Sequence, residues 1–111
     1  MPTMRLTPAV LFKLLLDNAG ITGYEAEYRF SERRWRWDFA WPHLTPPVAV
    51  EVDEETSHGR WYKLTQDRQK QNAATLLGWR LLRFSGAMLR DDPDTCVAQL
   101  RELLGCGAVP I

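Results

Sequence analysis

The chain has 111 residues, of which 45% are hydrophobic, and this length and composition suit one globular domain spanning residues 1–111. Fourteen basic and fourteen acidic residues cancel, so an anionic partner would have to meet a local basic patch. No apolar run is long enough for a membrane helix, and the N-terminus lacks a signal-peptide pattern. We therefore expect a soluble cytoplasmic protein without a membrane partner. Two cysteines, Cys96 and Cys106, are too few for a disulfide framework and lack zinc-site spacing, so we expect both to be reduced.

The N-terminal part of the chain predicts a helix followed by two strands. Thr7 and Pro8 are typical of a helix start, and Gly20 is typical of its end. Residues 24–30, YEAEYRF, and residues 33–42, RRWRWDFAWP, alternate aromatic and polar positions, which predicts two strands joined by a polar turn. We expect one face of the second strand to pack in the core beside the valines of the next strand; its residues are Trp35, Trp37, Phe39 and Trp41.

The rest of the chain predicts a third strand, a long helix, a fourth strand and a last helix. Their ranges are 48–53 (VAVEVD), 61–78, 79–84 (WRLLRF) and 92–105, with a loop at 54–60. This order predicts an α/β fold in which helices flank a mixed sheet, with a core of about residues 8–104. Because a helix separates the third and fourth strands, we expect the fourth strand to lie parallel to an earlier one.

The second and third strands can be aligned from their polar residues. A hairpin centred between residues 44 and 45 places Asp38 opposite Glu51 and Arg36 opposite Asp53, with the aromatic and valine side chains on the other face. Directly opposed residues have Cβ atoms about 5 Å apart. Two carboxylates held this close repel, so arginines or a divalent cation must offset their charge.

The first strand can bring a further acid to this patch. With a four-residue loop Glu27 opposes Asp38, and the acids Glu27, Asp38, Glu51 and Asp53 then share one face. Such an oxygen-rich site suits Mg²⁺ or Mn²⁺, which can polarise a phosphoryl oxygen and activate water for phosphodiester hydrolysis. The alternative is a solvated lattice of ion pairs without chemistry. Four acids among residues 51–55 are more negative charge than such a lattice needs.

Four segments, EYRF, RRWRWDFAWP, VAVEVD and DRQKQNAATLLGWRLLRF, resemble the PD-(D/E)XK nuclease superfamily. The resemblance is to the small phage and bacterial branch akin to very-short-patch repair endonucleases, and it spans about residues 24–104. It implies a restriction-endonuclease-like αβββαβ core, magnesium, and cleavage of DNA in repair or recombination. By position, Asp38 corresponds to the motif aspartate and Glu51 to the acid of the (D/E)XK element.

The chain departs from this pattern where the motif lysine is expected, two residues after Glu51, because Asp53 stands there. In such branches the task of the lysine can move to the following helix, whose polar residues here include Asp67, Lys70 and Asn72. Lys70 is then the candidate to orient or deprotonate the attacking water, which requires a lowered pKa. If no lysine is active, the resemblance implies a catalytically inactive module that binds DNA or a protein partner.

Several further side chains are candidates for contacting DNA, although the default explanation is an ordinary surface residue for the charged ones and core packing or a helix-entry contact for the aromatic ones. His58 titrates near neutral pH and could act as an acid or base, or contact phosphate. The candidates for phosphate contacts are Arg33, Arg34, Arg36, Arg60, Lys63 and Arg68, while Trp61 and Tyr62 could stack on an unpaired base. A chain of this size would need a homodimer to cut both DNA strands together.

Overall fold

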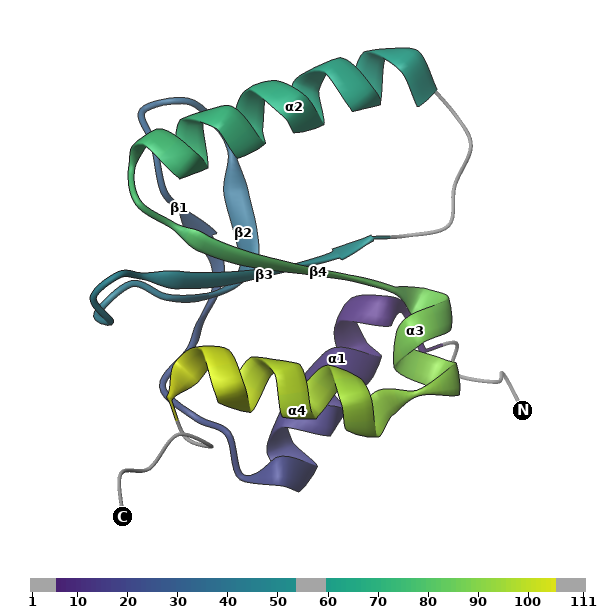
Figure 1. Ribbon diagram of the computed structural model, residues 1–111. Coiled ribbons are helices and arrows are strands. Elements are labelled where there is room, and N and C mark those ends of the chain that lie inside the picture. Colours follow the sequence, from purple (N-terminus) through teal and green to yellow (C-terminus); the bar gives the residue numbers. More distant parts are fainter. Residues whose placement is uncertain (1–5, 54–59, 106–111) are drawn as a thin grey trace.

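The computed structural model describes residues 6–53 and 60–105, without the side chains of residues 60–63. It shows a mixed α/β fold in which α2 covers one face of a four-stranded sheet and α1, α3 and α4 cover the other (Figure 1). The elements are α1 (Pro8–Ala19), β1 (Glu25–Arg29), β2 (Arg36–Trp41), β3 (Val48–Asp53), α2 (Arg60–Leu76), β4 (Arg80–Ser85), α3 (Gly86–Asp91) and α4 (Pro93–Leu104). Within the described ranges, none of these helices is long and apolar enough to cross a bilayer.

The predicted ends of the first and last helices are confirmed. At the start of α1 the Thr7 hydroxyl accepts a hydrogen bond from the Val10 backbone N–H at 3.2 Å, and Gly20 ends the helix with a φ of 71°. Asp92 caps α4, which ends at Gly105 with a φ of 83°. Glycine suits both ends because it adopts positive φ without steric cost.

Helix α3 is the one described helix that the sequence did not predict. It begins after Ser85, whose hydroxyl accepts a hydrogen bond from the Met88 backbone N–H at 3.1 Å. Its six residues are too few for a 3.6-residue hydrophobic period to emerge, so only the capping residue could have indicated it.

The sheet has the order β1-β2-β3-β4, with the first two pairings antiparallel and the last one parallel, as predicted. Phe39 pairs with Val50 and Trp41 with Val48, which is the hairpin register centred between residues 44 and 45. Ala26 pairs with Phe39, which is the register that the four-residue loop predicted for β1 and β2. The backbone alignment of the three antiparallel strands therefore agrees with the polar pattern of the sequence.

Two hydrophobic clusters cover the two faces of the sheet. The larger one joins β2, β3 and β4 to α1, α3 and α4 and includes Phe12, Leu16, Phe39, Trp41, Val48, Val50, Phe84, Leu89 and Leu100. The smaller one lies on the side of α2 and contains Trp37, Ala40, Ala49 and Ala74, with Tyr28, Phe30, Trp79 and Leu81 packed against it. Its small alanine side chains let α2 pack close to the sheet.

The prediction of a single aromatic face on β2 is wrong for two of its tryptophans. Trp37 belongs to the cluster on the α2 side, and Trp35 is only partly buried, stacking on Phe30 with ring centroids 6.3 Å apart. Phe39 and Trp37 belong to different clusters, so the alternation of faces is interrupted between them. On the neighbouring strand, Glu27 has a φ of 49°, outside the β region, and is not among the paired residues of β1 and β2.

Candidate functional site

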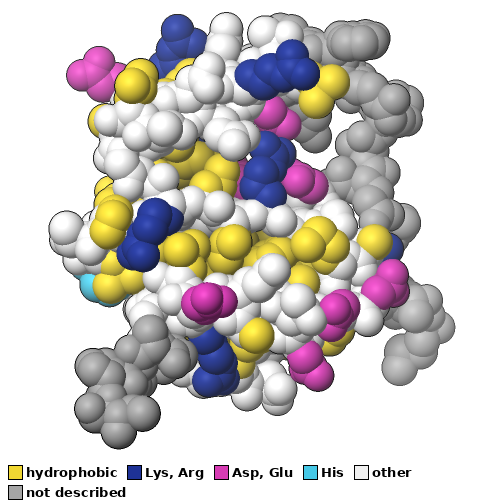
Figure 2. Space-filling view, viewed as in Figure 1, with side chains coloured by type: hydrophobic (Ala, Val, Ile, Leu, Met, Phe, Trp, Pro, Cys, Tyr) yellow, Lys and Arg dark blue, Asp and Glu magenta, His cyan; other side chains and the backbone are white. Residues whose placement is uncertain are grey.

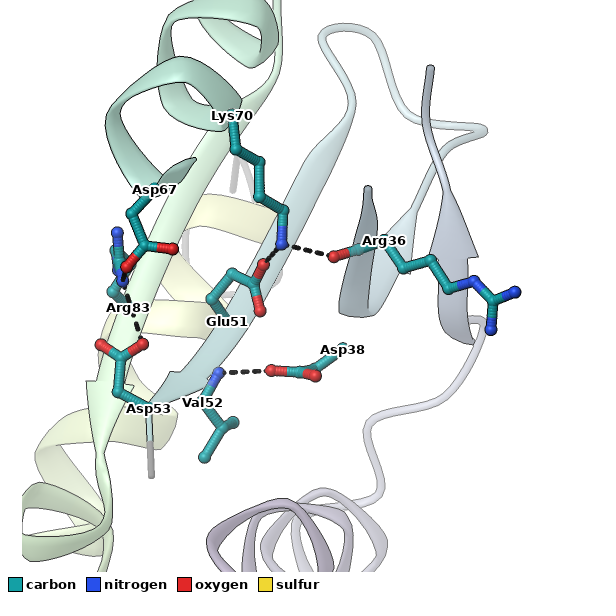
Figure 3. Close-up of polar contacts among 8 residues, drawn as sticks. All are labelled: Arg36, Asp38, Glu51, Val52, Asp53, Asp67, Lys70 and Arg83. Atoms are coloured by element: carbon teal, nitrogen blue, oxygen red, sulfur yellow. Dashed lines mark hydrogen bonds and ion pairs between the residues drawn. The ribbon is translucent and has the colours of Figure 1, made fainter. Parts of the chain in front are cut away.

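The carboxylate of Asp38 lies beside the backbone of the neighbouring strand. Its Oδ2 accepts a hydrogen bond from the Val52 N–H at 2.7 Å, and Val52 directly follows Glu51 on β3 (Figure 3). Burial raises the pKa of Asp38, and the charge of Asp53 adds to this increase, whereas the Val52 hydrogen bond and the charge of Lys70 oppose it. The structure thus brings together the two strand positions, 38 and 51, that the hairpin register predicted to be neighbours.

Helix α2 brings Lys70 to the same place. The Lys70 Nζ contacts Glu51 Oε1, donates a hydrogen bond to the Arg36 carbonyl at 2.5 Å, and lies 4.7 Å from the centroid of the Trp37 ring. The side chains of Lys70 and Glu51 are only 18% and 14% exposed, so solvent screens their interaction weakly. The lysine that the sequence singled out on this helix is therefore held against the candidate motif acid.

The environment of Lys70 changes its protonation. Burial lowers the pKa of Lys70 to about 8, with the charge of Arg83 acting in the same direction and that of Asp38 in the opposite one. At weakly alkaline pH a sizeable fraction of Lys70 is then a neutral amine, which can accept a proton. A fully solvated lysine would be almost entirely protonated under the same conditions.

A second group of charges ties β3, β4 and α2 together next to this pair. The Arg83 guanidinium on β4 donates hydrogen bonds to Asp53 Oδ1 at 3.0 Å and to Asp67 Oδ2 at 3.3 Å (Figure 3). Burial acts to lower the pKa of Arg83, but the two carboxylates raise it overall. Asp53 is thus engaged by a cation from the neighbouring parallel strand.

Sequence reasoning did not single out Arg83. The available signal was weak: Arg83 stands among the apolar residues of WRLLRF, in a strand expected to pair with an earlier one. In the observed register Arg83 pairs with Glu51, which places it next to both acids of β3. Knowing which strand β4 joins, and in what register, was necessary to predict this.

The other candidate residues lie apart from the group around Asp38 and Glu51. The carboxylate of Glu27 is 76% exposed and pairs with the Arg36 guanidinium at 3.8 Å. The side chains of Arg34, Arg68 and Asn72 are exposed. His58 lies outside the described residues, and so do the side chains of Arg60, Trp61, Tyr62 and Lys63.

Acidic and basic side chains lie next to one another between α2 and the sheet in Figure 2. Two cations, Lys70 and Arg83, face the carboxylates of Glu51, Asp53 and Asp67, and Asp38 adds a fourth acid beside them. Within residues 6–53 and 60–105 no group of three or more histidine, cysteine, aspartate or glutamate side chains could hold a metal ion.

Comparison with known proteins leaves the site to be interpreted from its own geometry, because no family model, curated protein or solved structure gives a significant match to this chain.

Proposed function

We propose that the protein is a metal-dependent endodeoxyribonuclease with a restriction-endonuclease-like core. The observation that carries this proposal is the position of Lys70, which α2 holds against Glu51 in a shielded corner beside Asp38. The element order from α1 to β4 supports it, since it has the αβββαβ sequence that the resemblance to PD-(D/E)XK nucleases implies. The substrate proposed is DNA, and its phosphodiester bond is the one hydrolysed.

The oxygens of Asp38 and Glu51 fit a magnesium or manganese ion. Asp38 Oδ2 and Glu51 Oε1 have partners, and among the described residues the second oxygen of each carboxylate has none. Mg²⁺ commonly keeps several waters and binds through one or two carboxylates together with substrate phosphate, so two protein ligands suffice. When bound, such an ion would polarise a phosphoryl oxygen and lower the pKa of a coordinated water.

Lys70 is the proposed group that handles the proton of the attacking water. Its neutral Nζ accepts a proton from the water, and the water oxygen forms a bond to phosphorus. The bond from phosphorus to the leaving oxygen breaks, and that oxygen keeps the electron pair and takes a proton from solvent. The Trp37 ring, whose centroid lies 4.7 Å from the Nζ, favours the ammonium that forms when the amine takes up this proton. A single active site acts on one strand, so we expect nicks unless two copies associate.

The second candidate function is a catalytically inactive module of the same fold that binds DNA or a protein. The contacts of Lys70 are also compatible with an inactive module. Its Nζ donates to two acceptors, Glu51 and the Arg36 carbonyl, which is what a purely structural lysine would do. Asp53, which stands where the motif lysine is expected, is likewise occupied by Arg83. Such a module would bind its partner without metal-dependent turnover.

Plasmid nicking in the presence of Mg²⁺, Mn²⁺ or EDTA distinguishes the two functions. The proposal expects divalent-dependent nicking that is lost in folded Asp38→Asn and Glu51→Gln proteins. Glu102→Gln is the matched control, because it removes one exposed carboxylate from α4, on the other face of the sheet. Nicking that persists in both site variants would refute the assignment, and absence of Mn²⁺ binding at millimolar concentration by calorimetry would favour the inactive module.

A further inference from the structure

The segment between β1 and β2, residues 30–35, forms a fixed turn. The Arg29 guanidinium donates hydrogen bonds to the carbonyls of Ser31 at 3.2 Å, Arg33 at 3.1 Å and Glu32 at 2.5 Å. The Ser31 hydroxyl also accepts a hydrogen bond from the Arg33 N–H at 3.1 Å. One guanidinium thus holds three successive carbonyls, and the backbone of this turn loses little further conformational freedom on binding a partner.

The turn presents a partly exposed aromatic ring with a cation against it. Trp35 stacks on Phe30, with the ring planes 15° apart, and the Arg33 guanidinium lies 4.9 Å from the centroid of a Trp35 ring. Phe30 also stacks on Trp37, with ring centroids 4.1 Å apart, and the Lys70 Nζ lies over the Trp37 ring. A series of ring contacts therefore links the turn to the proposed catalytic group.

The charge of the turn suits an anionic partner. Arg33 and Arg34 are exposed, and Glu32 is the one acid in the segment. The Arg34 side chain makes no hydrogen bond, ion pair or ring contact with another residue that the structure describes, so its guanidinium is available to a partner. Arg36 also has an exposed side chain, although it pairs with Glu27. The segment 33–36 thus carries three exposed arginines next to Trp35 in the sequence, in a chain whose overall formal charge is zero.

We propose that this turn binds single-stranded DNA, with an unpaired base stacked on Trp35 and the adjacent phosphates paired with Arg33 and Arg34. Aromatic rings bordered by basic residues bind single strands because every unpaired base offers a π-face, whereas the bases of a duplex are already stacked on one another. The choice of DNA rests on the proposed function. A single strand bound at the turn would then be positioned so that it continues towards Lys70.

Fluorescence anisotropy with labelled single-stranded DNA and a duplex of the same length tests this inference, in EDTA so that no cleavage interferes. Trp35→Leu keeps an apolar side chain but removes the aromatic face, and the dissociation constant for the single strand should rise about 5- to 150-fold. Trp35→Phe should retain most of the binding. Arg34→Ala should reduce the slope of log K against log salt by about 0.7, as expected for the loss of one phosphate contact.

Lys13→Ala is the control, because it removes one exposed cation from α1, on the other face of the sheet. Unchanged binding by both Trp35→Leu and Arg34→Ala, or equal affinity for duplex and single strand, would overturn the inference. Circular dichroism establishes that each variant is folded. Binding is measured without metal, so the two proposals can fail separately. If single-stranded DNA binding depends on Trp35 and Arg34 but the protein never nicks DNA, only the proposed catalysis is contradicted. If nicking is lost in Asp38→Asn but binding does not depend on Trp35 and Arg34, only this inference is contradicted.

Discussion

The protonation of Lys70 makes the free energy of unfolding depend on pH in a direction that the structure predicts. In the folded protein burial lowers the pKa of Lys70 from 10.5 to about 8. Between these two values the unfolded chain binds a proton that the folded chain does not, so raising the pH across this window favours the folded state. Below pH 8 both states are protonated, and the full cost of burying the ammonium is present.

The expected size follows from the width of the window. Stability should increase by about 1.4 kcal/mol for each pH unit, which amounts to about 3 kcal/mol over the whole interval. Lys70 has an 18% exposed side chain, so water screens this effect only slightly. The ion pair with Glu51 favours the charged form of Lys70 and so reduces the difference between its folded and unfolded pKa values. The figure of about 3 kcal/mol is therefore an upper value.

Urea unfolding of the wild type and of Lys70→Met between pH 7.5 and 10 measures the effect. Methionine retains the unbranched apolar stem and removes the titrating group, while other alkaline titrations contribute equally to both proteins. The stability of the wild type relative to the variant should therefore rise with pH. A difference that is constant or falls over this range would refute the lowered pKa, and with it the proposal that Lys70 accepts a proton near neutral pH.

The site supports three further predictions. Asp38→Asn should increase the free energy of unfolding at pH 7 and abolish nicking, because the raised pKa of Asp38 means that its ionised form destabilises the folded state; urea unfolding and a plasmid assay measure both. Arg83→Met should lower the free energy of unfolding by about 1 kcal/mol, because solvent weakens its ion pairs with Asp53 and Asp67, whose side chains are 47% and 38% exposed. Urea unfolding measures this loss, and its recovery in the double variant that also carries Asp53→Asn would support this account. Trp37→Leu should lower the free energy of unfolding by about 2 kcal/mol or more, because the Trp37 side chain is only 1% exposed and the smaller leucine leaves a cavity. Chemical unfolding measures this loss, and an unchanged stability would contradict the packing on the α2 side.

The backbone arrangement could be predicted from the sequence because its signals are local. The caps at Thr7 and Gly20 mark α1, and the two-residue alternation on β2 and β3 allows only one register that keeps all polar residues together. The parallel position of β4 follows from the helical connection before it. Each of these inferences needs only residues that are close in sequence, or strands that are joined by one turn or one helical connection.

The side-chain arrangement could be predicted only in part because it depends on contacts between distant elements. The face on which Trp37 lies departs from strict alternation, next to the positive φ of Glu27 on the neighbouring strand, and glutamate is not a residue type that signals such a conformation. The partner of Asp53 depends on the register of β4 against β3. Lys70 could be singled out only through the resemblance, and periodicity alone does not distinguish it from an exposed lysine on α2.

The two acids of β3 show how the chain can dispense with a lysine at position 53. Glu51 and Asp53 each meet a cation from a different element, Lys70 from α2 and Arg83 from β4. Arg83 pairs with Asp53, and its own charge acts together with burial to lower the pKa of Lys70. An acid at position 53 is therefore compatible with the proton-accepting role proposed for Lys70, because Arg83 pairs with that acid.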